Sequence, residues 1–162
     1  MTVLSTTPDP AALTLTIVAD LVAPPKRAWQ LWGDPRQLER WWGPPTWPAT
    51  FVQHDLVVGG RSDYFMTGPD GSTSHGWWQF QSVDEPRSLE FEDGFADDAG
   101  IPDPSMPTIM ARVELVETAG GTRMTITSRF ATLEQMEQLV TLGMAEGMTL
   151  AIGQIDAILA DG

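Results

Sequence analysis

The end of the sequence, residues 132–159, has the pattern of one long amphipathic helix. Its apolar side chains recur every three or four positions and therefore share one face: Met136, Val140, Met144, Met148, Ile152, Ile155 and Leu159. Thr132 followed by Gln135 fits a capping box, which predicts where the helix begins. If unbroken, the helix would be about 42 Å long. Such a helix needs a broad apolar surface to cover, and the upstream chain has to supply it.

Most of the upstream chain consists of short runs in which apolar and polar residues alternate, the pattern of half-buried strands. One run covers residues 13–21, and six more follow at 50–56, 60–67, 74–83, 88–95, 108–117 and 122–130. Two short helices are expected after the first run, over residues 26–32 and 36–41, with Asp34 as N-cap of the second. The turns between the later runs are too short for a parallel crossover, so these strands must be antiparallel.

These elements predict an α+β fold in which a curved seven-stranded antiparallel sheet surrounds the long C-terminal helix. Residues 1–12 are rich in Thr and Pro and are expected to form a mobile tail. Residues 13–162 are expected to form a single domain, because they contain no internal repeat and no linker. A strongly curved sheet is difficult to fill near the middle of the helix, which predicts a cavity between the two.

Charge and composition exclude several classes of function. The formal net charge is −13, with Lys26 as the single lysine, so nucleic acids and anionic membranes would be repelled. The absence of cysteine rules out disulfides, thiol catalysis and Cys-based zinc sites. The sequence contains no signal-peptide pattern and no run of about 18 apolar residues. We expect a soluble cytoplasmic protein that binds neither nucleic acid nor membrane.

The familiar catalytic motifs are missing from the sequence. It contains no nucleophile elbow, phosphate loop or dinucleotide fingerprint, and no cofactor is expected. His54 and His75 have no metal-ligand partner two or four positions away, so no metal is expected either. The acidic segment 93–103 does not fit a calcium loop and is interpreted as a solvated loop beside a pocket mouth. Enzyme activity stays open, because one acid in a dry cavity can catalyse alone.

Several motifs, taken in order, resemble a known family. They are Ala23-Pro24-Pro25, Asp34-Pro35, Arg40-Trp41-Trp42-Gly43-Pro44, Gly59-Gly60, Glu85-Pro86, Gly120-Gly121-Thr122 and Gly143-Met144-x-Glu146-Gly147. This set is similar to the SRPBCC (START/birch-pollen-allergen-like) superfamily, and within it to the single-domain activator-of-Hsp90-ATPase-homologue branch. The resemblance covers roughly residues 13–160 and implies a helix-grip fold with a deep apolar pocket, usually without an assigned reaction. Met148 departs from the family, which tends to have Trp there.

The side-chain phase of two strands decides which residues face the cavity. On residues 60–67, the resemblance favours the face of Tyr64 and Met66. On residues 77–83, either Trp78 and Phe80 point inward or Trp77 and Val83 do, and the two choices can hold together only with a bulge. We favour Trp78 and Phe80.

The candidate ligand-binding residues combine the inward strand faces with the apolar face of the helix. They are Tyr64, Met66, Trp78, Phe80, Phe91, Ala111, Val113, Ile126, Ser128, Val140, Met144, Met148 and Ile152. Core packing is the simpler interpretation for most of them. Two features favour a cavity: the stripe of flexible Met side chains on the helix, and the polar groups of Tyr64, Asp93 and Ser128 on otherwise apolar faces.

Two further patterns allow alternative interpretations. Five Trp residues lie between positions 29 and 47, and they either close one end of the sheet or form an aromatic gate or protein-contact patch. Gly143 and Gly147 weaken the helix by about 1 kcal/mol each relative to Ala. The missing side chains therefore mark either pocket volume or a close approach by the sheet, by the Trp-bearing helices or by a second subunit, which would make the protein a homodimer.

Three functions remain compatible with the sequence. The leading hypothesis is a protein that encloses a hydrophobic or aromatic small molecule between the sheet and the C-terminal helix. The alternative is a cofactor-independent enzyme, cyclase- or hydrolase-like, acting on a bulky hydrophobic substrate with Tyr64, Asp93 or His75 as proton-transfer groups. The third is a chaperone-associated interaction module, suggested by the family name. It ranks last, because the sequence shows no second domain for binding a client.

Overall fold

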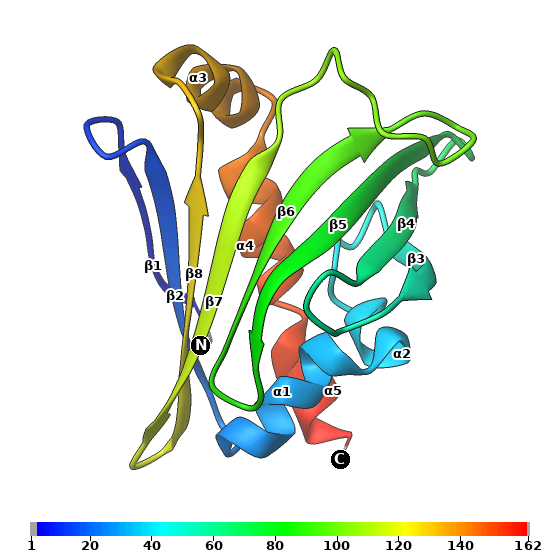
Figure 1. The fold of residues 1–162 in the computed structure, drawn as a ribbon. Helices are drawn as coiled ribbons and strands as arrows, with labels where there is room; N and C mark the ends of the chain where they lie inside the picture. The colour runs from blue at the N-terminus through cyan, green and yellow to red at the C-terminus, as the bar shows by residue number, and fades with distance from the viewer. Residues whose placement is uncertain (1–2, 162) are drawn as a thin grey trace.

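The strands form one open antiparallel sheet of eight strands in the order β1-β2-β8-β7-β6-β5-β4-β3 (Figure 1). The computed structural model describes residues 3–161. In chain order the elements are β1 (Val3–Asp9), β2 (Thr14–Leu21), α1 (Pro25–Gly33), α2 (Pro35–Leu38), β3 (Ala49–His54), β4 (Arg61–Thr67), β5 (Thr73–Asp84), β6 (Ser88–Ala96), β7 (Ile109–Thr118), β8 (Gly121–Arg129), α3 (Leu133–Thr141), α4 (Met144–Ile152) and α5 (Ile155–Ala160).

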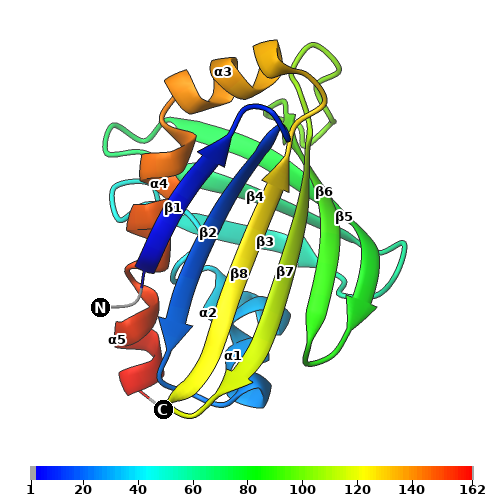
Figure 2. The same cartoon turned by 90° about the vertical axis from the view of Figure 1, so that its left-hand side faces the viewer.

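The helices cover one side of the curved sheet. Figures 1 and 2 show α4 and α5 running along the sheet, with α3 across one end and α1 and α2 near the other. This is the predicted α+β, helix-grip-like arrangement. The two short helices after β2 and the six strands that follow them are also present, close to their predicted positions.

The sheet contains one strand more than predicted. Val3–Asp9, expected to lie in a mobile tail, forms the edge strand β1 and pairs antiparallel with β2. The prediction of seven strands was therefore wrong, and so was the prediction of a mobile tail for residues 3–9. Residues 1 and 2 of the predicted tail lie outside the described residues. Most of β1 is exposed, so its sequence lacks the alternation that marks the other strands. Backbone pairing with β2 holds β1, which lies beside α4 (Figure 2). Thr6 Oγ1 lies 3.2 Å from Thr149 Oγ1 on α4.

A bulge resolves the ambiguous phase of β5. Trp78 and Phe80 are buried, as we favoured. The register with β6 then shifts around Gln81, since Phe80 pairs with Phe91 and Ser82 with Glu90. The extra residue turns Val83 toward the core as well. Trp77 stays on the outer face, so β5 combines parts of both alternatives.

The C-terminal helix begins as predicted but is not continuous. Thr132 is the N-cap of α3, and its Oγ1 accepts a hydrogen bond of 3.1 Å from the backbone N–H of Gln135. A bend of 60° then separates α3 from the following helical residues, 144–160. The bend lies at Gly143, whose φ is +93°. The long helix beside the sheet is thus α4 continued by α5, and α3 lies across its end.

Buried apolar residues form two clusters. The main core contains aromatic side chains of α1 and of the sheet, including Trp32, Trp78 and Phe91. Trp32 and Trp41 pack edge to face, with ring centroids 4.7 Å apart. A smaller cluster lies between α3 and the adjacent end of the sheet, and it contains Leu15, Ile109, Phe130, Met136 and Leu139.

Within residues 3–161, no single helix is long and apolar enough to cross a membrane, although α3 and residues 144–160 together have the length and composition of a bent span.

Candidate functional site

A groove of about 420 Å³ lies between the sheet and the C-terminal helices, a volume typical of small-molecule sites. Its walls come from the loop after α2, from strands β4 to β7, and from α3, α4 and their junction. The lining residues are Trp42, Gly43, Pro44, Trp47, Tyr64, Met66, Ser74, Asp93, Phe95, Ile109, Leu139, Leu142, Gly143, Met144, Gly147, Met148 and Ala151. The lining is mostly apolar, and the side chains of Tyr64, Ser74 and Asp93 provide its polar groups.

The helical wall is open where two glycines lack side chains. Gly143 adopts a left-handed conformation that other residues rarely take, and this conformation makes the bend between α3 and α4 possible. Gly147 lies one turn later, inside α4. A Cβ at either position would meet no atom within 4 Å. The predicted close approach by the sheet or by the Trp-bearing helices was therefore wrong, and the two missing side chains add volume to the groove.

The opposite wall is the loop after α2, which carries Trp42 and Trp47. The side-chain amide of Gln154 fixes this loop to the C-terminal helix, because its Nε2 donates to the carbonyl oxygen of Gly43 at 2.8 Å. The ring of Trp47 lies over Gly68, where a Cβ would come within 2.6 Å of the indole carbon Cζ2. Both contacts hold the aromatic side of the groove in place.

Tyr64 and Asp93 form a polar pair in the groove. The phenol O–H of Tyr64 on β4 donates a hydrogen bond of 3.1 Å to Oδ1 of Asp93 on β6. The ring crosses β5 at Gly76, where a Cβ would lie 2.5 Å from the Tyr64 oxygen. Glycine at this position therefore lets β4 and β6 share a hydrogen bond across the strand between them.

The aromatic surroundings of this pair change its acid–base properties. Burial raises the pKa of Asp93 to about 7, although the hydrogen bond from Tyr64 favours the carboxylate. Burial, followed by the charge of Asp93, raises the pKa of Tyr64 well above its usual value. Asp93 therefore exchanges a proton near neutral pH while Tyr64 keeps its proton, and a carboxyl of this kind is suited to acid–base chemistry.

Two indoles help to keep water away from the pair. The ring centroids of Trp42 and Trp78 lie 6.3 and 5.9 Å from that of Tyr64. The Nε1 atoms of both indoles are buried, and neither has a hydrogen-bond partner among residues 3–161. Trp78 also stacks on Phe91, with centroids 4.2 Å apart. Asp93 is thus hydrogen-bonded to a tyrosine that is itself surrounded by aromatic rings, and burial is the physical reason for the raised pKa of its carboxyl.

The structure brings four of the candidate ligand-binding residues to the groove: Tyr64, Met66, Met144 and Met148. The others lie outside its lining. Seven pack in the main core, namely Trp78, Phe80, Phe91, Ala111, Val113, Ile126 and Ile152, while Val140 packs against the smaller cluster and Ser128 is buried on β8. For the strand residues among them, alternation identified the inner face of the sheet, but most of that face is filled by neighbouring side chains.

The three candidate proton-transfer residues do not form one group. Tyr64 and Asp93 are hydrogen-bonded, as described above. His75 does not line the groove; its ring lies 5.4 Å from that of Phe65, and its Nε2 is 3.2 Å from the hydroxyl of Thr73. Among the described residues, no three His, Asp or Glu side chains are placed to hold a metal ion.

Much of the groove wall was not predicted from the sequence. Pro44 and Leu142 in loops and Ser74 and Phe95 on strands line the groove but were not among the candidates, and Trp42 and Trp47 were predicted only as a gate or an end cap. The motif around Trp42 carried a usable signal, because Gly43 and the prolines predict an irregular loop that exposes the indoles between them. The positions of Phe95 and Leu142 carried no comparable signal.

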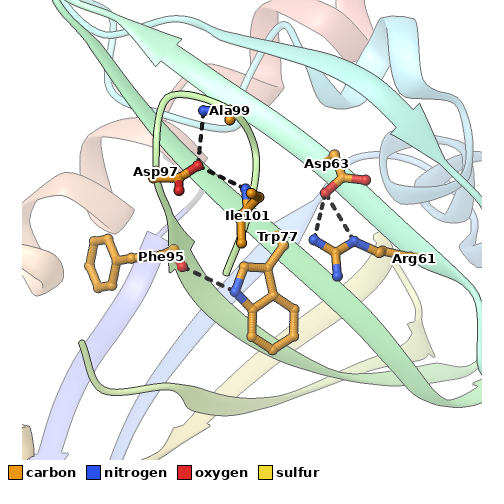
Figure 3. Close-up of polar contacts among 7 residues, drawn as sticks. All are labelled: Arg61, Asp63, Trp77, Phe95, Asp97, Ala99 and Ile101. Carbon is orange, nitrogen blue, oxygen red and sulfur yellow. Dashed lines mark hydrogen bonds and ion pairs between the residues drawn. The ribbon is translucent and has the colours of Figure 1, made fainter. Parts of the chain in front are cut away.

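The acidic loop after β6 lies apart from the groove. In Figure 3, Oδ1 of Asp97 accepts hydrogen bonds from the backbone N–H groups of Ala99 and Ile101, at 2.9 and 3.0 Å. Neighbouring side chains on the outer sheet face make their own contacts: Trp77 Nε1 donates to the carbonyl oxygen of Phe95, and Arg61 pairs with Asp63 (Figure 3). The loop borders a second hollow, of about 410 Å³, on this outer face instead of the groove mouth.

Comparison with known proteins identifies the family. The family model described as Activator of Hsp90 ATPase homolog 1-like protein matches residues 22–160. The chain belongs to this family. The resemblance to the Hsp90-activator-homologue branch of the SRPBCC superfamily, inferred from motifs, is thereby confirmed. A comparison with curated proteins found no match.

Solved structures of similar proteins extend the assignment over nearly the whole chain. A protein from Arthrobacter aurescens is 52% identical, with a TM-score of 0.95, covering 99% of this chain and 94% of that one. Protein Ms6760 from Mycobacterium smegmatis is 48% identical, with a TM-score of 0.90, covering 97% and 96%. The AHSA1 protein SPO3351 from Silicibacter pomeroyi, at 23% identity and a TM-score of 0.73, covers 91% and 97% and shares the fold.

Proposed function

We propose that this member of the Activator of Hsp90 ATPase homolog 1-like family binds a hydrophobic or aromatic small molecule in the groove between the sheet and α3–α4. One observation carries the proposal. The helical wall leaves open space at Gly143 and Gly147, whereas protein interiors are usually close-packed. Flexible Met side chains and the rings of Trp42 and Trp47 surround that space, and such groups adapt to apolar ligands.

Thermal unfolding with a panel of lipids and aromatic metabolites tests this proposal. A ligand that binds only the folded state at a hundred times its Kd stabilises it by about 2.7 kcal/mol, which corresponds to a shift of several degrees in Tm. Native mass spectrometry of freshly purified protein would reveal a ligand carried through purification, together with the number of subunits.

Filling the groove provides the control. Met148→Trp places the larger side chain of the family at a lining position, so it should abolish the ligand-induced shift while the protein stays folded. Leu150→Trp adds an indole to the same helix at an exposed position and should leave the shift unchanged. Binding in this groove would be contradicted if no compound raised the Tm of the wild type or of Leu150→Trp. It would also be contradicted if the two variants showed the same shift in Tm.

A second candidate, acid–base catalysis on a hydrophobic substrate, is favoured by one specific observation. The carboxyl of Asp93 has a pKa of about 7 and is hydrogen-bonded to Tyr64 inside the groove. An enzyme of this kind would lose turnover in Asp93→Asn while the variant still bound the substrate. Unchanged turnover in that variant would leave binding as the function.

A further inference from the structure

The charges around the groove restrict which ligands it can accept. Asp93 supplies the one carboxyl among the described lining residues, and none of them is Lys, Arg or His. A carboxylate or phosphate head group would therefore meet no cationic partner, and it would lie beside a group that is itself partly ionised at neutral pH. The net charge of −13 adds to this repulsion.

Asp93 retains unused capacity to bind a donor. Its two oxygens have about four acceptor positions, and the hydrogen bond from Tyr64 occupies one of them. A positive charge placed beside a buried carboxyl favours its ionised form and offsets the cost of burying it. The rings of Trp42, Trp47 and Tyr64 also line the groove, and aromatic faces attract cations.

Among the described residues, no cationic side chain pairs with Asp93. His75 lines a small neighbouring cavity together with Tyr64 and Asp93, but its Nε2 lies 3.2 Å from the Thr73 hydroxyl and its ring lies 5.4 Å from that of Phe65. Arg61 pairs with Asp63 on the outer sheet face. The helices opposite Asp93 contribute only apolar lining residues, such as Leu139, Met144 and Met148. Tyr64 is the one titratable side chain hydrogen-bonded to Asp93 in the described structure.

Building on the proposed binding function, we propose that the ligand is a protonated amine with an apolar or aromatic body. The ammonium group donates to the carboxylate of Asp93, close to the rings of Tyr64 and Trp42. The apolar body extends along the Met144 and Met148 wall, into the space beside Gly147. Ionised Asp93 is needed for the pairing, so amine binding strengthens as the pH rises through the pKa of this carboxyl.

The test compares three probes that share one bicyclic body and differ in the head group: 2-(1-naphthyl)ethylamine, 2-(1-naphthyl)ethanol and 1-naphthylacetate. Their Kd values are measured by calorimetry at pH 8 and pH 5.5. At pH 8 the amine should bind at least tenfold more tightly than the alcohol, and naphthylacetate should bind most weakly. At pH 5.5 the preference for the amine should shrink, because Asp93 is then protonated while the amine stays charged.

Two variants with the same change in net charge identify the group responsible. Asp93→Asn keeps the shape of the side chain and should equalise the Kd values of amine and alcohol. Asp98→Asn, in the exposed loop after β6, should keep the preference of the wild type.

The possible failures can be told apart. Equal affinity for all three probes, or tighter binding of naphthylacetate, would overturn the amine assignment and leave apolar binding intact. An amine preference that survives Asp93→Asn would overturn the role of this carboxyl. No binding of any probe would count against the groove as a small-molecule site, and so against both proposals.

Discussion

At the scale of single residues, Gly143 and Gly147 should respond in opposite ways to the same substitution. Gly143→Ala forces a side chain into a left-handed conformation and should cost about 1 kcal/mol. Gly147→Ala occurs inside α4 with open space around the new Cβ, so it should gain about 0.5–1 kcal/mol from better helix propensity. Urea unfolding of the two variants measures both changes. Destabilisation by Gly147→Ala would mean that a neighbour does approach this position.

The carboxyl of Asp93 gives the protein an unusual dependence of stability on pH. Its pKa in the folded protein is about 7, above the value near 3.9 of an unfolded chain. Between those values the folded state binds a proton that the unfolded state does not, so this contribution to stability falls as the pH rises from 4 to 7 and is constant above. Asp93→Asn should therefore gain on the order of 2 kcal/mol over the wild type between pH 5 and pH 8.

The comparison with Asp93→Asn is needed because His54 acts in the opposite direction. Burial lowers the pKa of His54. Its Nδ1 lies 2.7 Å from Ser62 Oγ, and its Nε2 lies 2.7 Å from the carbonyl oxygen of Trp32. Its contribution is present above the unfolded pKa near 6.5 and falls as the pH drops below that value. Both proteins contain His54, so it cancels in their difference. A difference that does not change between pH 5 and 8 would show that Asp93 is not protonated at pH 5.

Part of the site could be predicted from the sequence. The alternation of side chains, together with the family resemblance, placed Tyr64 and Met66 on the inner face of the sheet. Helical spacing placed Met144 and Met148 on the apolar face of the helix, and all four line the groove. Phe91 and Val113 have the same pattern but are covered by other side chains. Period-two spacing identifies a face of a strand; whether that face is filled depends on residues far away in the sequence.

At the scale of elements, the first turn of α3 depends on Thr132. Its hydroxyl accepts from the backbone N–H of Gln135, one of the N–H groups that lack a partner inside the helix. Thr132→Ala should cost about 1 kcal/mol and speed hydrogen exchange in α3. Thr141→Ala, at the exposed end of the same helix, is the matched control and should change stability far less. Equal effects would mean that the cap does not hold the helix start.

The elements differ in how well the sequence defined them. Strands with one buried face alternate clearly, as β2 does from Thr14 to Leu21. β1 was missed because its exposed positions do not alternate, and pairing with β2 does not depend on side-chain identity. The bend after α3 was also missed, because an apolar stripe continues through Gly143, and glycine is compatible with both a straight helix and a left-handed turn.

At the scale of the whole molecule, the general architecture followed from the order of elements. Short turns require antiparallel neighbours, and an amphipathic helix at the end supplies a cover for the sheet. The position of the groove did not follow, because it depends on the 60° bend and on the loop that Gln154 fixes to the helix. The open space lies where β4–β7, that loop and the bent helix meet, so it depends on parts of the chain that are far apart in sequence.

The two separate apolar clusters give the ends of the molecule unequal resistance to local opening. α3 rests on the smaller cluster, around Leu15 and Phe130, whereas α1, α5 and most of the sheet share the larger aromatic one. We expect release of α3 to disrupt the smaller cluster and the contacts between α3 and α4, with Gly143 as the junction between the two helices. We therefore expect that a molecule wider than the entrance of the groove enters by a brief displacement of the nine-residue helix α3, while the tryptophan-rich core remains intact.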